Sequence, residues 1–276
     1  LCTRVRSIPL TLHPPAGQMP SQMTDAPHYK RVLLKISGES FAARGAYGLD
    51  ADELASIAKA IVEAMETGTE IGVVVGGGNM IRGADLSRRI GIDQSTADYM
   101  GMLATVINAL ALQDTLEQLG QPTRVQTAVH MAQIAEPYIR RKATRHLEKG
   151  RVVIFAGGTG NPFFTTDTTA ALRAIEIEAG VVLKGTHSGT GGIYTADPKK
   201  DPSATLLEQV SHLEVIQKGL QAMDATAITL CMDNDLPIVM FDLMQAGNVR
   251  SILAGEAIGT LCLLYTSDAA DEGLGV

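Results

Sequence analysis

A glycine-rich stretch between a predicted strand and a predicted helix has the composition of an anion-binding loop. Residues 158–167 read GTGNPFFTTD and directly follow the apolar run 152–155. Glycine lets backbone N–H groups approach a ligand closely, threonine hydroxyls and the Asn amide add hydrogen bonds, and a helix start favours negative charge. A hydrated connecting loop is the alternative, because turns also collect Gly, Thr, Asn and Pro. The stretch predicts a site for an anion at a strand end.

Two other strand ends carry the same kind of turn. Lys35 lies near the end of the predicted strand 31–37 and is soon followed by Gly38, while the strand 71–75 runs into Gly-Gly-Gly-Asn at 76–79. A lysine on an apolar strand is unusual unless its amine reaches the strand end, whereas a glycine triplet also suits a tight strand-to-helix turn. Open α/β sheets bind ligands at one edge, so we expect the three turns to converge there.

The charged residues near these turns fit the transfer of a phosphoryl group, which needs positioning and charge neutralisation more than covalent help. Lys35 can act as a point charge, Arg82 as a bidentate donor, and Asp167 or Asp224 can orient a lysine or Mg²⁺. Asp98, in the first turn of a long predicted helix, can bind a ligand or only favour the helix dipole. Neither a Walker A pattern nor a kinase-type glycine loop is present, and the histidines lack metal-ligand spacing.

The elements that must position these residues alternate between strands and helices. Short apolar runs predict strands at 31–37, 71–75, 123–129, 152–155, 181–184 and 237–242. Apolar periodicity and capping residues predict helices at 50–67, 95–119 (capped by Ser95), 136–149, 167–179, 211–218, 224–234 and 248–253. Residues 185–205 read as a long loop. This alternation predicts one α/β domain over residues 24–261, with a mostly parallel sheet covered by helices on both faces.

Composition narrows the class of protein. Of 276 residues 45% are hydrophobic and 19% charged, as in ordinary globular domains, and the net charge of -7 comes with no basic block. Nucleic acid is therefore not expected as the main partner, although nucleotides need only a local basic pocket. No apolar run approaches the roughly 20 residues that span a bilayer. Three widely spaced cysteines suggest a reducing compartment, and we expect a cytoplasmic protein.

Both ends of the chain differ from the predicted domain. Residues 1–23 carry several prolines and no acidic residue before Met23, and are expected to be a disordered extension. Residues 262–276 begin CLLYTSDAADE, which resembles the translation of a sequencing adaptor. We expect this second segment to be an artefactual tail without function.

Six blocks of sequence resemble one family when taken in order: YKRVLLKISGES (29–40), VVVGGGNMIRG (73–83), DYMGMLATVINALAL (98–112), GTGNPFFTTD (158–167), EIEAGVVLKGT (176–186) and YTADPKKDP (194–202). Over about residues 28–261 the chain is similar to the bacterial UMP kinases of the amino-acid-kinase family. The resemblance implies a three-layer αβα sandwich that assembles as a homohexamer in the cytoplasm. It also implies an allosteric enzyme of pyrimidine biosynthesis that transfers the γ-phosphate of ATP, with Mg²⁺, to UMP.

The same resemblance assigns site residues by position. The catalytic residues would be Lys35, Arg82, Asp167 and Asp224. ATP would be bound by Lys35, Ile36, Ser37, Gly38, Gly78, Arg82, Thr186, Tyr194 and Asp197. UMP would be bound by Gly77, Asp98, Thr159, Gly160, Asn161, Pro162, Phe163, Phe164, Thr165 and Thr166. GTP, an activator in this family, would act through Ala43, Arg44, Gly45, Ala46, Tyr47 and Gly48, and UTP would inhibit.

One segment departs from the family pattern. After Lys184-Gly185-Thr186 the family runs Lys-Val-Asp-Gly, whereas here residues 187–193 read HSGTGGI, two residues longer and without that lysine or aspartate. The missing lysine would have met an ATP phosphate. We hypothesise that Lys184 partly substitutes for it.

Two other functions are compatible with the same fold. A kinase acting on a carboxylate, such as acetylglutamate or aspartate, is the nearest, although Asp98 and the run NPFFTT speak against it. A nucleotide-binding regulator or storage protein without turnover is the other, because of the altered loop at 187–193. ADP release in the presence of each acceptor separates the three.

Overall fold

The structure is a computed structural model that describes residues 28–81, 91–187, 190–198, 200–201, 203–220 and 222–264. One sheet runs through this part of the chain. Its strands are β1 (Arg31–Ile36), β2 (Glu70–Val75), β3 (Thr123–Thr127), β4 (Glu136–Pro137), β5 (Val152–Ala156), β6 (Val182–Thr186), β7 (Gln209–Ser211), β8 (Ile238–Asp242) and β9 (Thr260–Leu263). They lie in the order β4-β3-β5-β2-β1-β6-β8-β9-β7.

The sheet is mostly parallel, as the sequence predicts. β1 pairs in parallel with β2 and with β6, and β8 is antiparallel only to β9. Every residue of β1 is buried, because both faces of the central strands are covered. The C-terminal ends of β5, β2, β1, β6 and β8 therefore meet at one edge of the sheet.

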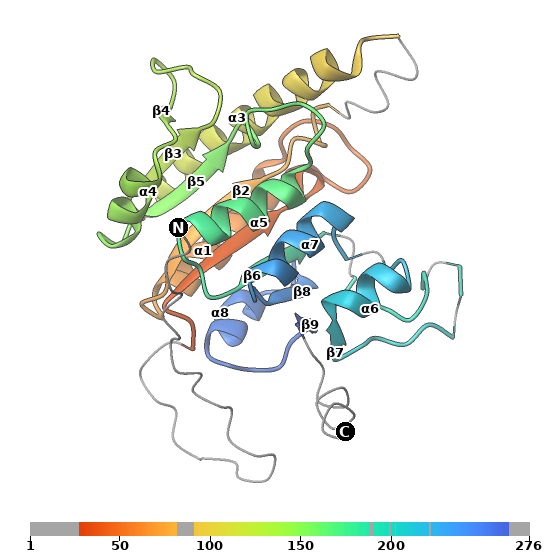
Figure 1. Cartoon of the computed structure of the whole chain (residues 1–276). Helices are drawn as coiled ribbons and strands as arrows, with labels where there is room; N and C mark the ends of the chain where they lie inside the picture. The colour runs from red at the N-terminus through yellow and green to blue at the C-terminus, as the bar shows by residue number, and fades with distance from the viewer. Residues whose placement is uncertain are drawn as a thin grey trace, which may run out of the picture.

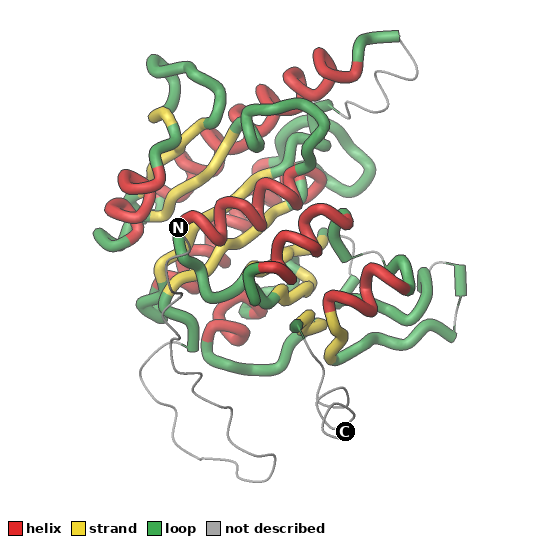
Figure 2. The backbone as a smooth tube through the Cα atoms, viewed as in Figure 1, coloured by secondary structure: helices red, strands yellow, loops and turns green. Residues whose placement is uncertain are grey.

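Helices cover the sheet on both faces and complete three layers (Figures 1 and 2). One face carries α1 (Ala51–Met65), α3 (Gln94–Gln118) and α8 (Asn248–Leu253), and the other carries α4 (Arg140–Leu147), α5 (Thr166–Glu176), α6 (His212–Gln217) and α7 (Ala225–Asp233). Successive residues of the central strands pack alternately into two hydrophobic cores, one on each face of the sheet. Leu34 packs with the α1 and α3 side and Leu33 with the α5 and α7 side. The predicted αβα sandwich is confirmed.

Two predicted helix starts were wrong, and the helix predicted at 167–179 ends already at Glu176. Helix α3 is capped by Asp93, whose carboxylate accepts hydrogen bonds from the backbone N–H groups of Ser95 and Thr96, so Ser95 lies inside the helix. The helix predicted at 136–149 begins only at Arg140. Its first residues are extended and pair with β3 as β4, because a residue before proline is pushed out of the helical region.

The short strands near the chain's end were not predicted. Strands β7 and β9 pair with each other, and β9 also pairs with β8, so their conformation depends on partners distant in sequence. Strand β9 ends at Leu263, two residues beyond the domain boundary predicted at Leu261, and Cys262 is buried within it. A single bridge between Tyr194 and Leu206 organises the long loop after β6. The predicted extension 1–23 and most of the predicted tail lie outside the described residues.

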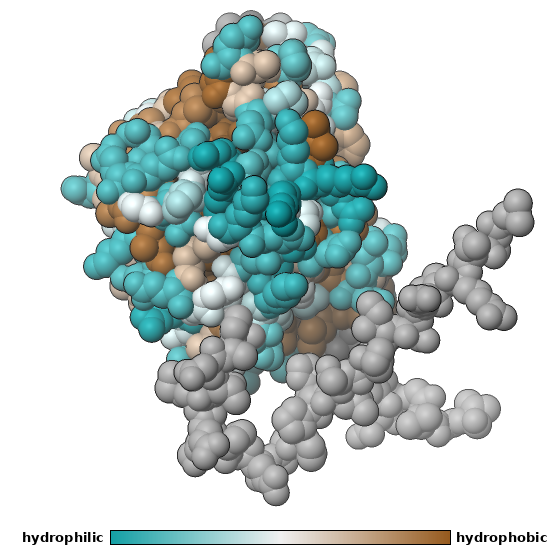
Figure 3. Space-filling model, turned by 90° about the vertical axis from the view of Figure 1, so that its left-hand side faces the viewer, coloured by the Kyte–Doolittle hydropathy of each residue, from teal (hydrophilic) through white to brown (hydrophobic). Residues whose placement is uncertain are grey.

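The edge of the molecule near β4 and α4 is mainly hydrophilic, with scattered hydrophobic residues (Figure 3). Exposed cations of α4, among them Arg141, Lys142 and Arg145, contribute to this surface. Within the described ranges, no helix is both long and apolar enough to cross a membrane.

A buried histidine makes the stability of this fold sensitive to mild acid. His212 begins α6 with no exposed surface. Burial lowers its pKa, although the Leu236 backbone and the Asp235 carboxylate oppose the shift. The unfolded chain therefore takes up a proton near pH 6.5 before the folded chain does, and the free energy of unfolding should fall as the pH drops below that value.

We expect His212→Leu to flatten this dependence between pH 7.5 and 5, as measured by urea unfolding. Asp167, whose pKa is lowered in the fold, also reduces the free energy of unfolding, but only at more acidic pH, near the unfolded carboxyl pKa of about 3.9 and below it. An equal slope in the variant and the parent protein would contradict this assignment.

Candidate functional site

The turns after β1 and β2 are packed backbone to backbone. A Cβ atom on Gly38 would lie 2.3 Å from the backbone nitrogen of Gly78, and one on Gly76 would lie 2.5 Å from the nitrogen of Gly38. Such approaches exclude any side chain, so these glycines are required by the geometry of the two turns. The result is a surface of bare main chain at the centre of the sheet edge.

Helix α3 lies against the same turns and against the turn after β5. A Cβ atom on Gly77 would lie 2.8 Å from the carbonyl oxygen of Gly101 on α3. The hydroxyl of Thr105 accepts a 2.8 Å hydrogen bond from the backbone N–H of Gly157, at the end of β5. Sequence reasoning gave Thr105 no function, because nothing local distinguishes it from other helix residues.

The loop between β5 and α5 is anchored at both ends. Gly157, Gly158 and Gly160 have positive φ angles, as does Phe163 at 69°. The carboxylate of Asp98 accepts a 2.8 Å hydrogen bond from the backbone N–H of Phe163, which holds this strained residue against α3. Two residues further on, where the loop meets α5, the Thr165 hydroxyl caps the helix by accepting from the N–H groups of Asp167 and Thr168.

Two lysines and one aspartate form an ion cluster where β1, β6 and α5 meet. The Nζ atom of Lys35 lies 2.7 Å from one carboxylate oxygen of Asp167, and the Nζ atom of Lys184 lies 2.8 Å from the other. The side chains are only 9%, 15% and 15% exposed for Lys35, Asp167 and Lys184. Lys184 also donates to the carbonyl of Ala222.

Electrostatics keep the aspartate of this cluster ionised. Burial works to raise the pKa of Asp167, but the ammonium groups of Lys35 and Lys184 outweigh it and hold the pKa below its usual value. The pKa of Lys184 is lowered, first by burial and then by the charge of Lys35, with Asp167 opposing. With all three groups charged, the cluster carries one net positive charge in a poorly solvated place, which favours a polyanion.

Asp224 ties α7 to the loop before α5. Its carboxylate caps α7 through the backbone N–H of Ala227, and it accepts hydrogen bonds from the hydroxyls of Thr165 and Thr168. Its charge also acts on Lys184. The structure therefore places Asp224 beside the ion cluster rather than on an unrelated surface.

A cavity of about 230 Å³ lies on the α3 side of the cluster. We call it the α3 pocket; it is lined by Gly77, Gly78, Ile81, Ala97, Asp98, Gly101, Met102, Thr105, Gly158, Thr159, Phe164, Thr165 and Thr166. Residues from three chain segments distant in sequence thus surround one space. Most residues predicted to bind UMP are among them, together with Gly78, which was predicted to bind ATP.

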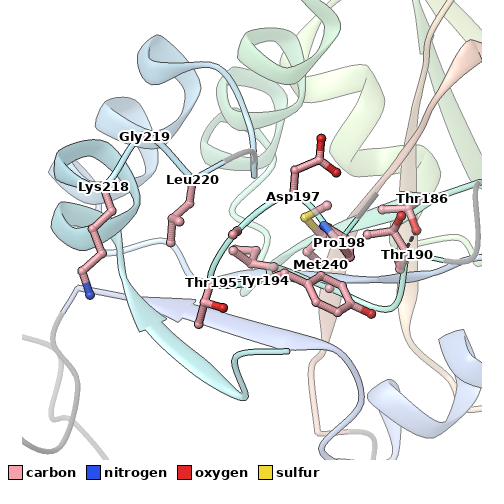
Figure 4. A pocket seen from close by; sticks show the side chains of 13 residues that line it. Thr186, Thr190, Tyr194, Thr195, Asp197, Pro198, Lys218, Gly219, Leu220 and Met240 are labelled. Atoms are coloured by element: carbon pink, nitrogen blue, oxygen red, sulfur yellow. Dashed lines mark hydrogen bonds between the residues drawn. The ribbon is translucent and has the colours of Figure 1, made fainter. Parts of the chain in front are cut away.

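A second cavity of about 440 Å³ lies beyond β6, between the loop at 190–198 and the turn after α6 (Figure 4). We call it the β8 pocket; its lining comprises Thr186, Thr190, Gly192 to Pro198, Lys218, Gly219, Leu220 and Met240. Thr186, Tyr194 and Asp197 were predicted there from the sequence. Lys218, Leu220 and Met240 were missed, since no motif marks them and only the packing of α6 and β8 brings them to the loop.

The order of strands places the ion cluster between the two pockets. The α3 pocket is built on the turns after β2 and β5, the β8 pocket on β6 and β8, and β1 with Lys35 runs between them. Thr166 of the first pocket adjoins Asp167, and Thr186 of the second lies two residues after Lys184. Two ligands in the two pockets would therefore point toward a shared centre that holds the two ammonium groups.

The remaining predicted residues take varied positions. Ile36 is fully buried in the α1 side of the core, so only its backbone can reach a ligand. Gly160, Asn161, Pro162 and Phe163 do not line the α3 pocket, and the Phe163 side chain is 75% exposed. Residues 43–47 form an exposed loop that ends at half-buried Gly48. Arg82 lies outside the described residues.

Comparisons with known proteins agree with this arrangement. A model of the amino acid kinase family matches residues 30–242. Among solved structures, the UMP kinase of Bacillus anthracis is 38% identical, with a TM-score of 0.84 over 86% of this chain and 97% of its own. The UMP kinase of Ureaplasma parvum (32%, TM-score 0.79, 85% and 98%) and the uridylate kinase of Archaeoglobus fulgidus (27%, 0.65, 84% and 99%) are also similar.

Proposed function

This chain belongs to the amino acid kinase family, and from that premise we propose that it is a UMP kinase, which converts ATP and UMP to ADP and UDP. The observation that carries the proposal is the ion cluster of Lys35, Asp167 and Lys184 between two pockets at one sheet edge. The names of the similar structures, UMP kinase and uridylate kinase, support the choice of acceptor.

The geometry suits a transfer between two anions. A phosphate monoester loses its second proton near pH 6, so the acceptor oxygen of UMP is already ionised at neutral pH and needs no general base. That oxygen attacks the γ-phosphorus of ATP while the bond from γ-phosphorus to the bridging oxygen of ADP breaks. The protein must hold two mutually repelling anions in line, which is what two ammonium groups and bare backbone N–H groups provide.

Mg²⁺ is expected to arrive with ATP. Among the described residues no three His, Cys, Asp or Glu side chains gather as a metal site. Both oxygens of Asp167 face ammonium groups, so a further cation is disfavoured there. The described residues of the cluster therefore do not fit a resident metal, and phosphates and water are the better ligands for Mg²⁺.

Each pocket has a proposed occupant. UMP would occupy the α3 pocket, where Asp98 offers carboxylate oxygens to the ribose hydroxyls and Thr165 and Thr166 lie toward the ion cluster. ATP would occupy the β8 pocket, with its base among Ile193, Leu220 and Met240. Lys35 and Lys184 would contact the transferred phosphoryl group, while Asp167 and Asp224 position them. GTP activation through residues 43–48, UTP inhibition and a cytoplasmic location are further proposals from the family resemblance.

A homo-oligomer is proposed from the outer face of α3, consistent with the hexamer implied by the resemblance. Tyr99, Leu103 and Ile107 are 47%, 50% and 49% exposed and recur every four residues, so they form one apolar stripe. The opposite face of the helix is already buried against the sheet. A second copy of the chain, packing α3 against α3 about a twofold axis, would cover the stripe.

The double variant Leu103→Glu, Ile107→Glu should reduce the mass in solution measured by light scattering, because it places charges within the apolar stripe. Leu119→Glu is the matched control, since Leu119 is equally exposed but lies at the helix end outside the stripe. A parent protein with the 29.2 kDa mass of one chain would refute the interface.

A coupled assay of ADP release tests the proposed function. We expect turnover with UMP and none with acetylglutamate or aspartate. Tight binding of ATP or UTP without turnover would instead support the regulator or storage protein. Turnover with acetylglutamate or aspartate would support a carboxylate kinase.

A further inference from the structure

Two buried carboxamides, Asn79 and Asn108, form a closed pair beside the turn after β2. Asn108 on α3 has no exposed surface and Asn79 is 2% exposed. The Nδ2 atom of Asn108 donates to Oδ1 of Asn79 at 2.7 Å, and Nδ2 of Asn79 donates to Oδ1 of Asn108 at 3.0 Å. Each amide therefore uses one of its two hydrogens on its partner.

The second hydrogen of each amide goes to a different segment of main chain. Asn108 donates to the carbonyl of Gly76 at 2.7 Å, and Asn79 donates to the carbonyl of Gly48 at 2.7 Å. Rotating either amide by half a turn would set its oxygen against a carbonyl oxygen, so both orientations are fixed. All four N–H donors are satisfied, as a buried polar network must be to be rigid.

The pair thus connects three segments that are distant in sequence. Gly76 belongs to the bare turn that touches Gly38, Asn108 belongs to the long helix, and Gly48 ends the exposed loop at 43–48. A second link, from the Gly48 N–H to the Asn79 carbonyl at 3.0 Å, strengthens the connection to the loop. The glycine turn has no side chains of its own with which to fix its position.

We propose that the Asn79–Asn108 pair is the device that positions the Gly76–Gly78 turn, with Asn108 as the positioning residue and Asn79 as its link to the loop at 43–48. The turn presents its backbone to anionic oxygens at the centre of the site. Displacement of such a group by about 1 Å can cost a hundredfold in rate. Asn108 acts through the turn and contacts neither substrate.

The choice of substrates in the test rests on the proposed function. Gly77 and Gly78 line the α3 pocket, and the turn packs against Gly38 at the end of β1, next to the proposed phosphate-binding centre. A displaced turn should therefore weaken both nucleotides together. A loss of folded protein would instead lower the apparent kcat and leave both KM values unchanged. Hydrogen exchange of the segment around 71–81 measures the stability of the turn in the absence of substrate. Its result therefore tests the positioning of the turn even if UMP is not the acceptor.

The experiment compares Asn108→Leu with Gln126→Met, which removes another fully buried carboxamide, one that donates to Glu136 on the outermost strand β4. We expect Asn108→Leu to raise the KM values for ATP and UMP by about tenfold and to speed exchange at 76–78. Gln126→Met should do neither. Unchanged KM values and unchanged exchange in Asn108→Leu would overturn the proposal.

A second variant serves where Asn108→Leu does not fold. Asn108→Asp keeps the side-chain shape, but its carboxylate cannot donate to the Gly76 carbonyl, whereas its protonated form can. Relative to the parent enzyme, its defect should shrink as the pH falls from 8 to 6, because burial raises the pKa of a carboxyl group. A defect independent of pH would count against a donor function for Asn108.

Discussion

Replacement of Asp167 by asparagine is expected to lower kcat by about two to three orders of magnitude, because the two ammonium groups that we propose neutralise the transferred phosphate lose their fixed positions. In the parent protein one carboxylate holds Lys35 at 2.7 Å and Lys184 at 2.8 Å. An amide cannot balance two ammonium charges, and its NH₂ group repels one of them. The two ammonium groups would then move away from each other, or Lys184 would lose its proton.

The same substitution should destabilise the free protein. Removing one partner of a buried ion pair leaves an uncompensated charge and costs about 3–5 kcal/mol. Here the loss falls on two lysines that are 9% and 15% exposed. A non-hydrolysable ATP analogue supplies the missing negative charge, so it should raise the melting temperature of Asp167→Asn more than that of the parent protein.

The control for this prediction is Asp114→Asn, which removes an exposed carboxylate from α3 at a distance from the cluster. It should change neither kcat nor the melting temperature appreciably. An Asp167→Asn enzyme with near-normal turnover would remove the ion cluster from the mechanism. A variant that is slow but as stable as the parent would show that the buried lysines find other partners.

The sequence was sufficient for the six longer strands and their glycine turns because their signals are local. Runs such as 152–155 are apolar throughout, as buried parallel strands require, and glycines mark where these strands end. Strands β7 and β9 carry no such signal, since three or four residues become a strand only when a partner lies beside them. Proline at 137 and the competing cap at Asp93 explain the two misplaced helix starts.

For the site, residue types were predictable and pairings were not. Lys35 and Asp167 were singled out separately, yet their contact depends on α5 starting directly over the end of β1. Asn79 and Asn108 are 29 positions apart and only their packing reveals the paired amides. The β8 pocket has the same origin, because Leu220 and Met240 approach Tyr194 only after α6 folds beside the sheet.

Lys184→Met is expected to reduce kcat/KM for ATP by about a hundredfold, with a smaller change in the KM for UMP. We propose its ammonium group as one of two that offset the phosphate charge, and the loop that follows lacks the lysine that the family resemblance implies. The lowered pKa of Lys184 adds a pH test. In the parent enzyme kcat/KM for ATP should fall as the pH rises toward the ordinary lysine pKa of about 10.4, because the ammonium form is lost early. This alkaline limb should be absent in the variant.

A rescue variant separates charge from packing in this prediction. His187 follows Thr186 at the position where the family resemblance implies a lysine. His187→Lys in the Lys184→Met background should therefore restore an ammonium group near the proposed phosphate site. We expect at least tenfold recovery of kcat/KM for ATP, roughly the effect of one restored charged hydrogen bond. Lys59→Met, on the exposed face of α1, is the control and should match the parent enzyme. If Lys184→Met binds and turns over ATP normally, Lys35 alone carries the charge, and Lys184 serves only to hold Asp167 in place.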